Sequence, residues 1–469
     1  MTSPHSSHPI PPGRRPATVI AAMLILAVVI LVFLDMMSGV RALSLGALAC
    51  VLVYILMGWK RLRTNTRGLL AMSLVVTGVY VAGDGTLDEY ALAASRAMYL
   101  PALIAVMTLL RIAAPRSSMI SRAGYYVVDQ PPSRRFLLLA GAAHLFGILL
   151  NIGGFLLLMN IAQQTRKATP APPDVAAVQE RRIATAIMRG FAAAMIWSPV
   201  GIALNILLPI LPGLSWIDYL PYGLAATLAF CLVGWAFDRM EPRPRGPLPR
   251  KAGLGSPAAL FGLIALMVTI TGSAGLAEVL LGMPLRAAIL LIVPSFAFGW
   301  VLLTRAPGES ATAAGGWLAA EAGVQLPNAA NEICVMTASG YVGMLIATLV
   351  PSDELRTLIL WTGLEGGSLA VAIGATIVVT SLIGVNPMIP GTVLVASVVA
   401  ADLPISNLLL LLAVLTSWAV ALVSSPMTST VAIASSVVDK PPSVIGFRWN
   451  GAFSLTFFAL VSMLFLAIG

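Results

Sequence analysis

The chain has 469 residues, of which 58% are hydrophobic and only 10% are charged. Soluble domains carry about 25% charged residues, so this composition excludes a soluble domain with a single anchor and indicates an all-α polytopic membrane protein. The formal charge of +9 invites a nucleic-acid partner, but the placement of the basic residues argues for membrane topology instead. We therefore expect the lipid bilayer, and no nucleic acid, as the partner of the basic residues.

Long apolar segments follow one another along the chain, and a spanning helix needs about 20 apolar residues. They cover residues 18–35, 42–58, 69–83, 94–112, 136–162, 184–212, 219–237, 256–276, 285–304, 330–350, 366–399, 404–437 and 451–468. The first segment lacks a clear cleavage site for a signal peptidase. We expect it to remain as an extra first helix, 18–36, after a cytoplasmic tail of residues 1–17.

Four of these segments are unusual in length or carry helix-breaking residues near their middle. Segments 136–162 and 366–399 are expected to be re-entrant hairpins, which enter and leave the membrane on the same side. Segments 184–212 and 404–437 are expected to cross the membrane as interrupted helices. The sequence thus predicts about 11 transmembrane helices plus two re-entrant hairpins.

The basic residues give this arrangement an orientation. With a cytoplasmic N-terminus, 24 of the 28 lysines and arginines fall on the inner side, Arg189 among them. Only Arg41, Arg96, Arg286 and Arg356 fall outside or near the outer face. Such an excess follows the positive-inside rule, so we expect a multi-pass protein of the cell inner membrane.

The breaks recur in the same order in two halves of the chain. Repeat 1, residues 37–237, and repeat 2, residues 254–469, each contain five crossings, an odd number that gives the halves opposite orientations. A basic, proline-rich cytoplasmic linker, 238–253, joins them. Helix-breaking residues at corresponding places in two halves point to the binding site of a secondary transporter.

These breaks expose backbone groups at membrane depth, where only a cavity or a partner can satisfy them. Freed carbonyls suit a hard cation, and half-helix N-termini suit an anion. The asparagines either contact the ligand or cap half-helices, and the hydroxyls either bind the ligand or bond back to their own helix. The candidate site residues are Asn151, Gly153 and Gly154 at the first tip, Ser198 and Pro199 at the first break, Asn386 and Pro387 at the second tip, and Ser425, Pro426, Thr428, Ser429 and Thr430 at the second break.

Ionisable residues within the apolar segments are few, and such groups are functional hypotheses by default. His144 either couples transport to a proton or is a neutral histidine bonded to a backbone carbonyl. We interpret Glu332 and Glu365, which open their segments, as end residues exposed to water. We expect no arginine at the middle of a span, so an anion would be held by helix ends and hydroxyls.

Enzyme chemistry is not indicated, because the sequence has no P-loop, no metal-ligand cluster, and no histidine with acidic partners at catalytic spacing. We expect no metal site and no cofactor, and transport would use Na⁺ or H⁺ as the coupling ion. The partner is then a small anionic substrate. A sodium/proton antiporter and a membrane subunit that does not move solutes remain as alternatives.

Two stretches carry a family resemblance: Gly340-Tyr-Val-Gly-Met-Leu-Ile-Ala-Thr-Leu-Val before the second hairpin and Leu149-Leu-Asn-Ile-Gly-Gly at the first tip. With the order hairpin, interrupted helix and final helix in each half, the chain resembles the ion transporter superfamily, which includes divalent anion/sodium symporters and arsenite permeases. The tips keep the asparagine of the symporters' Ser-Asn-Thr but not its hydroxyl neighbours. The resemblance implies ion-coupled secondary transport of a small organic or inorganic anion, an elevator-type motion and a homodimer.

Overall fold

The computed structural model describes residues 16–83, 86–168, 171–241 and 255–469. These residues form helices and no strand, and eleven of the described helices are long and apolar enough to cross a membrane. The prediction of an all-α polytopic membrane protein is therefore confirmed. The expected tail up to residue 15 and the expected linker from residue 242 lie outside the described residues.

The first half of the described chain contains ten α-helices. They are α1 Pro16–Ser38, α2 Ala42–Gly58, α3 Thr64–Ala82, α4 Leu87–Ala113, α5 Ser118–Val128, α6 Pro132–Leu150, α7 Ile152–Lys167, α8 Pro173–Trp197, α9 Ile202–Leu207 and α10 Trp216–Met240. Two of the expected irregularities stand out in this order. The chain breaks at Asn151 between α6 and α7, and again at residues 198–201 between α8 and α9.

The second half also contains ten. They are α11 Pro257–Leu281, α12 Leu285–Leu303, α13 Ala311–Asn328, α14 Ala330–Leu349, α15 Ser352–Thr362, α16 Gly366–Leu382, α17 Met388–Ala400, α18 Asn407–Ser424, α19 Ser429–Val438 and α20 Asn450–Ile468. The chain breaks at residues 383–387 between α16 and α17 and at 425–428 between α18 and α19. A π-helical turn, Val444–Trp449, precedes α20.

Some helices were not expected from hydropathy. The 11-residue helices α5 and α15 and the 18-residue helix α13 fall in stretches too polar or too short to stand out as spans. The number of candidate spans, eleven, agrees with the expectation, but the helices concerned differ. Helix α6, expected as an arm of a hairpin, is among the eleven, and α3, expected as a span, is not. Helix α15 meets α16 at an angle of 114°.

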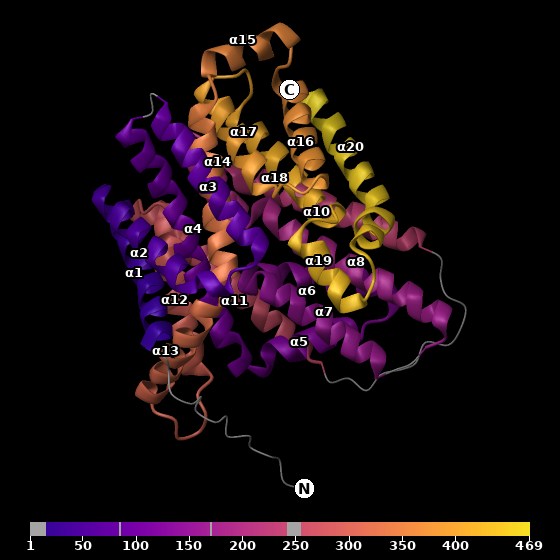
Figure 1. Ribbon diagram of the computed structural model, residues 1–469. Helices are drawn as coiled ribbons and strands as arrows, with labels where there is room; N and C mark the ends of the chain where they lie inside the picture. Colours follow the sequence, from indigo (N-terminus) through magenta and orange to yellow (C-terminus); the bar gives the residue numbers. More distant parts are fainter. Residues whose placement is uncertain (1–15, 84–85, 169–170, 242–254) are drawn as a thin grey trace.

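The helices pack as two groups (Figure 1). Helices α1–α4 and α12–α14 pack on one another at the left of the view, whereas α6, α8, α10, α16, α18 and α20 pack on one another at the right. Helix α15 and the end of α20 lie at one end of the molecule, and α5 and α13 lie toward the other. The packing of α17 on α14 and of α6 on α4 connects the groups.

One basic residue takes an unexpected position. Arg189, counted above with the cytoplasmic side chains, is only 4% exposed in the middle of α8. Its Nε donates to Asn450 Oδ1 at 3.0 Å, and its two Nη atoms donate to the carbonyls of Gly234 at 3.3 Å and Trp449 at 3.2 Å. The π-helical turn Val444–Trp449 ends at the second of these carbonyls. Arg189 therefore joins α8 to α10 and α20, because a buried guanidinium must find acceptors for its N–H groups.

Candidate functional site

The first hairpin tip is a single strained residue, Asn151. Its φ of 51° and ψ of −138° are rare for a residue with a side chain and cost about 1–3 kcal/mol. The backbone N–H of Asn151 donates to the Gly147 carbonyl at the end of α6, and its own carbonyl accepts from Gly154 and Phe155 at the start of α7. The tip thus closes one helix and opens the next, which leaves the amide side chain free to contact other elements.

The side chain of Asn151 reaches an ion pair formed by two other helices. Its Nδ2 donates to Glu332 Oε1 at 3.3 Å, and Arg111 donates to both carboxylate oxygens of Glu332 at 3.1 and 3.2 Å. Arg111 stands in the last turn of α4 and Glu332 in the first turn of α14, where each charge complements its helix dipole. The expectation that Glu332 is a water-exposed end residue is wrong, because its side chain is 17% exposed.

Glycine allows this tip to approach the ion pair and to fold back on α6. A Cβ at Gly153 would lie 3.0 Å from Cδ of Arg111. A Cβ at Gly154 would lie 2.3 Å from the carbonyl oxygen of Phe146 in α6, so no side chain fits there. At both predicted positions, therefore, glycine is favoured because a larger residue would crowd a neighbouring group.

The first helix break is held by a polar residue that hydropathy did not single out. Asn205, in α9 and 2% exposed, donates through Nδ2 to the carbonyls of Pro199 and Gly201, the latter at 2.9 Å. Its Oδ1 accepts from the Tyr99 hydroxyl of α4 at 3.0 Å. The carbonyls that the break frees are thus partly occupied. Ser198 is fully buried, and its Oγ has no partner among the described residues, which leaves a polar group for a water molecule or a ligand.

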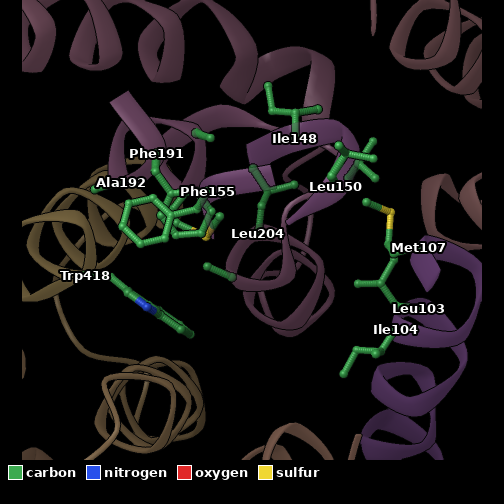
Figure 2. Close-up of a cluster of buried hydrophobic side chains, with 14 of the residues drawn as sticks. Leu103, Ile104, Met107, Ile148, Leu150, Phe155, Phe191, Ala192, Leu204 and Trp418 are labelled. Carbon is green, nitrogen blue, oxygen red and sulfur yellow. The ribbon is translucent and has the colours of Figure 1, made fainter. Parts of the chain in front are cut away.

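The first tip and the first break line one cavity. Its walls come from α4, the tip and the break: Leu103, Ile104, Met107, Gly147, Asn151, Met195, Val200, Gly201 and Ile202. Figure 2 shows the apolar packing around this place, with Leu103, Ile104 and Met107 on one side, Ile148 and Leu150 of the hairpin, and Leu204 of α9 between them and Phe191. The cavity is mostly apolar, with the amide of Asn151 as a polar side chain in its wall.

His144 lies beside the same break. Its ring stacks on Trp197, the last residue of α8, with centroids 5.9 Å apart. Trp197 Nε1 donates to His144 Nε2 at 2.9 Å. A nitrogen that accepts an indole N–H carries no proton, so the imidazole is neutral in this arrangement.

The second tip uses its asparagine as a cap. Asn386 Oδ1 accepts from the Met388 N–H at 3.1 Å, at the start of α17. Pro387, which precedes that helix, is buried. This local bond corresponds to the capping alternative for Asn386, whereas Asn151 makes a contact between distant elements.

The second break closes on itself and on the second hairpin. Ser425 Oγ donates to the Ser381 carbonyl of α16 at 2.6 Å and accepts from the Met427 N–H at 3.2 Å. Thr428 Oγ1 donates to the carbonyls of Leu422 at 3.0 Å and Ser425 at 2.9 Å. The hydroxyl-rich run therefore satisfies its own broken backbone. Of the other predicted residues, Thr430 is buried, Pro426 is half-buried and Ser429 is exposed.

The contacts sort the predicted residues into two groups. Asn151 lies with the first break in one cavity, and the second break is bonded to the second hairpin. The half-helices after the breaks cross over, because α9 packs on α17 and α19 packs on α7. No hydrogen bond of the described residues joins Asn151 to Asn386.

Sequence reasoning missed Arg111, Asn205 and Tyr99 as parts of the site. Each is a polar side chain within or at the end of an apolar segment, which is the signal that could have found Asn205. The side-chain partner of each residue is more than 90 positions away in the chain, so no local pattern could have identified these side-chain pairs.

Known proteins resemble the chain in fold alone. No protein-family model matches the chain, and no curated protein matches it in sequence. The crystal structure of the Alcanivorax borkumensis YdaH transporter, reported to have an unusual topology, matches with a TM-score of 0.50 and 14% identity over 77% of this chain and 83% of that chain. Neisseria gonorrhoeae MtrF, described as illuminating a class of antimetabolite efflux pumps, matches with a TM-score of 0.50 and 12% identity over 87% of this chain and 96% of that chain. The chain is a multi-pass membrane protein with a fold found in transporters.

Proposed function

We propose that this protein is an ion-coupled secondary transporter of a small organic or inorganic anion, with Na⁺ or H⁺ as the coupling ion. In this proposal it is a homodimer of the inner membrane with a cytoplasmic N-terminus, related to the ion transporter superfamily. Residues 37–237 and 254–469 form inverted repeats, and a unit of roughly 136–212 and 366–437 moves as an elevator against the remaining helices.

One observation carries the proposal: each hairpin stands against the broken spanning helix that follows it in the chain. Asn151 and the break at residues 198–201 line one cavity, and Ser425 bonds to the second hairpin. Broken helices near the middle of the membrane supply both N-terminal amides and carbonyls for ions. The likeness to the folds of YdaH and MtrF supports a transporter over a subunit that moves no solute.

The direction of transport can be tested first as export. MtrF is described among efflux pumps, and by analogy we propose export as the direction of transport. We would reconstitute the full chain in proteoliposomes loaded with one labelled anion at a time: succinate, benzoate, phosphate or sulfate. Loss of label would then be followed with an inward Na⁺ gradient, with an inward H⁺ gradient, and with neither.

We expect gradient-dependent export of at least one anion, and we expect Asn151→Gly to reduce it at least tenfold. Glycine relieves the positive φ and removes only the amide, so the variant keeps its fold. Asn328→Ala, an exposed asparagine at the end of α13, is the matched control and should export as the unmodified protein does. Proton release on adding Na⁺ without any organic solute would instead identify the sodium/proton antiporter. Full export by Asn151→Gly would show that the Asn151 side chain at the first tip takes no part in the transport site.

A further inference from the structure

A second cavity is lined by two arginines that form no ion pair with any carboxylate among the described residues. It lies among α4, α9, α12 and α14, and Arg96 of α4 and Arg286 of α12 both line it. The other lining residues are Ala97, Tyr99, Leu100, Asn205, Ile206, Pro209, Gly340 and Met344. From the sequence we expected these arginines only outside or near the outer face, and we expected helix ends and hydroxyls to hold an anion. The two arginines line one cavity because the fold brings α4 and α12 together.

Neither guanidinium has an ion-pair or hydrogen-bond partner among the described residues, although both side chains are half-buried. Among the acidic side chains that the structure describes, Asp35 attracts Arg286, while Arg96 repels it. Asp35 Oδ2 already accepts hydrogen bonds from Ser44 at 2.6 Å and Ser95 at 3.1 Å. Two positive charges therefore line a partly dehydrated cavity whose described wall contains no acid, and Asp35 is engaged with the two serines. This arrangement favours an added anion.

The wall of the cavity holds Arg286 in place without using its donors. The guanidinium lies over the Tyr99 ring, 5.4 Å from the centroid. A cation–π contact of this kind leaves the in-plane N–H groups free to bind oxygen atoms. The Tyr99 hydroxyl is fixed in turn by Asn205 Oδ1 at 3.0 Å.

We propose that Arg96 and Arg286 bind a small oxyanion, a carboxylate or a phosphate group, at the open side of this cavity, whose interior has room for little more than a water molecule. Paired guanidinium groups are the side chains best suited to a planar carboxylate or a phosphate, because they donate in a fixed fork. The site lies next to the first break, since Asn205 contacts both the Tyr99 wall and the carbonyls of Pro199 and Gly201. Its role as a substrate site rests on the proposed function, whereas its binding of an oxyanion does not.

The test uses the purified full chain in a neutral detergent. Thermal unfolding would be followed by tryptophan fluorescence while sodium phosphate or sodium succinate is titrated against sodium chloride at constant ionic strength. A ligand that binds only the folded state raises the unfolding temperature with its concentration. We expect saturable stabilisation by phosphate or succinate and none by chloride.

The variants assign that stabilisation to the two arginines. We expect Arg96→Gln and Arg286→Gln each to weaken the apparent affinity at least tenfold, and the double variant to abolish the response. Arg96→Lys and Arg286→Lys should recover part of it, because lysine keeps the charge without the fork. The exposed Arg41→Gln should titrate as the unmodified protein does. Phosphatidylglycerol would also be added to the detergent. If only this lipid raises the unfolding temperature, and the rise requires both arginines, the oxyanion bound at the site is a lipid phosphate.

A chemical footprint covers the case in which the glutamine variants do not fold. Phenylglyoxal modifies accessible arginines, and mass spectrometry would locate the adducts at Arg96 and Arg286 in the unmodified protein. Protection of both by phosphate or succinate, but not by chloride, supports the site. Equal stabilisation by every salt, an unchanged affinity in the double variant, or no protection overturns it.

Failure of this inference can be told apart from failure of the proposed function. If proteoliposomes export an anion and the double variant exports and binds it normally, the arginine site is wrong and the transporter stands. If the oxyanion binds through both arginines but no gradient moves any anion, the site stands and the transporter is wrong.

Discussion

At the scale of single residues, the first tip depends on its own amide side chain and on a carboxylate and a guanidinium from two separate helices. Asn151 donates to Glu332, which Arg111 holds with two hydrogen bonds. The two side chains of the ion pair are 27% and 17% exposed, so water screens the pair less than it would at the surface. The strained backbone of Asn151 is therefore fixed against a partly buried charge pair.

Glu332→Gln tests this contact. Glutamine can still accept from Asn151, but it removes the charge opposite Arg111, so we expect a loss of about 1–3 kcal/mol in stability. Thermal unfolding of the purified protein measures it. Asp402→Asn is the control, because Asp402 is 93% exposed in its pair with Arg356 and exposed pairs contribute about 0–1 kcal/mol. Equal effects of the two changes would mean that the pair at the tip is screened like a surface pair.

At the scale of elements, the first hairpin packs closely on the broken helix that follows it. A Cβ at Gly190 of α8 would stand 2.1 Å from the Ala140 carbonyl oxygen and 2.5 Å from its Cα in α6. These are backbone atoms, so they cannot move aside as the end of a flexible side chain can. Small residues let membrane helices approach closely, and here they set the position of the tip relative to the break.

Gly190→Ala should therefore push α6 and α8 apart. We expect a loss of about 1–3 kcal/mol from overpacking, seen as a lower unfolding temperature, together with lost transport. Gly141→Ala in α6 is the matched control, because nothing lies within 4 Å of its added Cβ. Alanine there should be neutral or stabilise by about 0.5–1 kcal/mol. An unfolding temperature for Gly190→Ala as high as for Gly141→Ala would show that the helices can separate without cost.

At the scale of the whole molecule, the ends of the helix bundle differ in what they carry. Helix α15 and the C-terminal residue Gly469 lie at one end, and Gly469 packs against the start of α16. Helices α5 and α13 lie toward the opposite end. The positive-inside rule predicts that the end with α15 faces outward and that the loop before α13 faces the cytoplasm.

Single cysteines in a chain freed of Cys50, Cys231 and Cys334 would test this orientation. Thr362→Cys, exposed at the end of α15, should react in intact cells with a thiol reagent that cannot cross the membrane. Ala306→Cys, exposed before α13, should react only after permeabilisation. The reverse labelling pattern would mean that the protein has the opposite orientation in the membrane. Reaction of both cysteines in intact cells would contradict a membrane span between them.

The sequence by itself determined the solvent, the helical class and the places where helices break. These are local properties: apolar length decides whether a helix lies in lipid, and residues such as Pro199 and Asn151 interrupt a helix wherever the chain carries them. The short helix α5 and the more polar α13 escaped prediction because neither has the length and apolarity of a span.

Only the tertiary structure decided what the polar side chains do. Asn151 meets Glu332 across 181 positions, and Arg189 meets Asn450 across 261. Thr428 bonds to its own broken helix, although its sequence equally suited a ligand. Arg96 and Arg286 share a cavity only because α4 packs on α12. The cost of burying a polar group is fixed by its chemistry, but the partner that offsets this cost is chosen by the packing of distant helices.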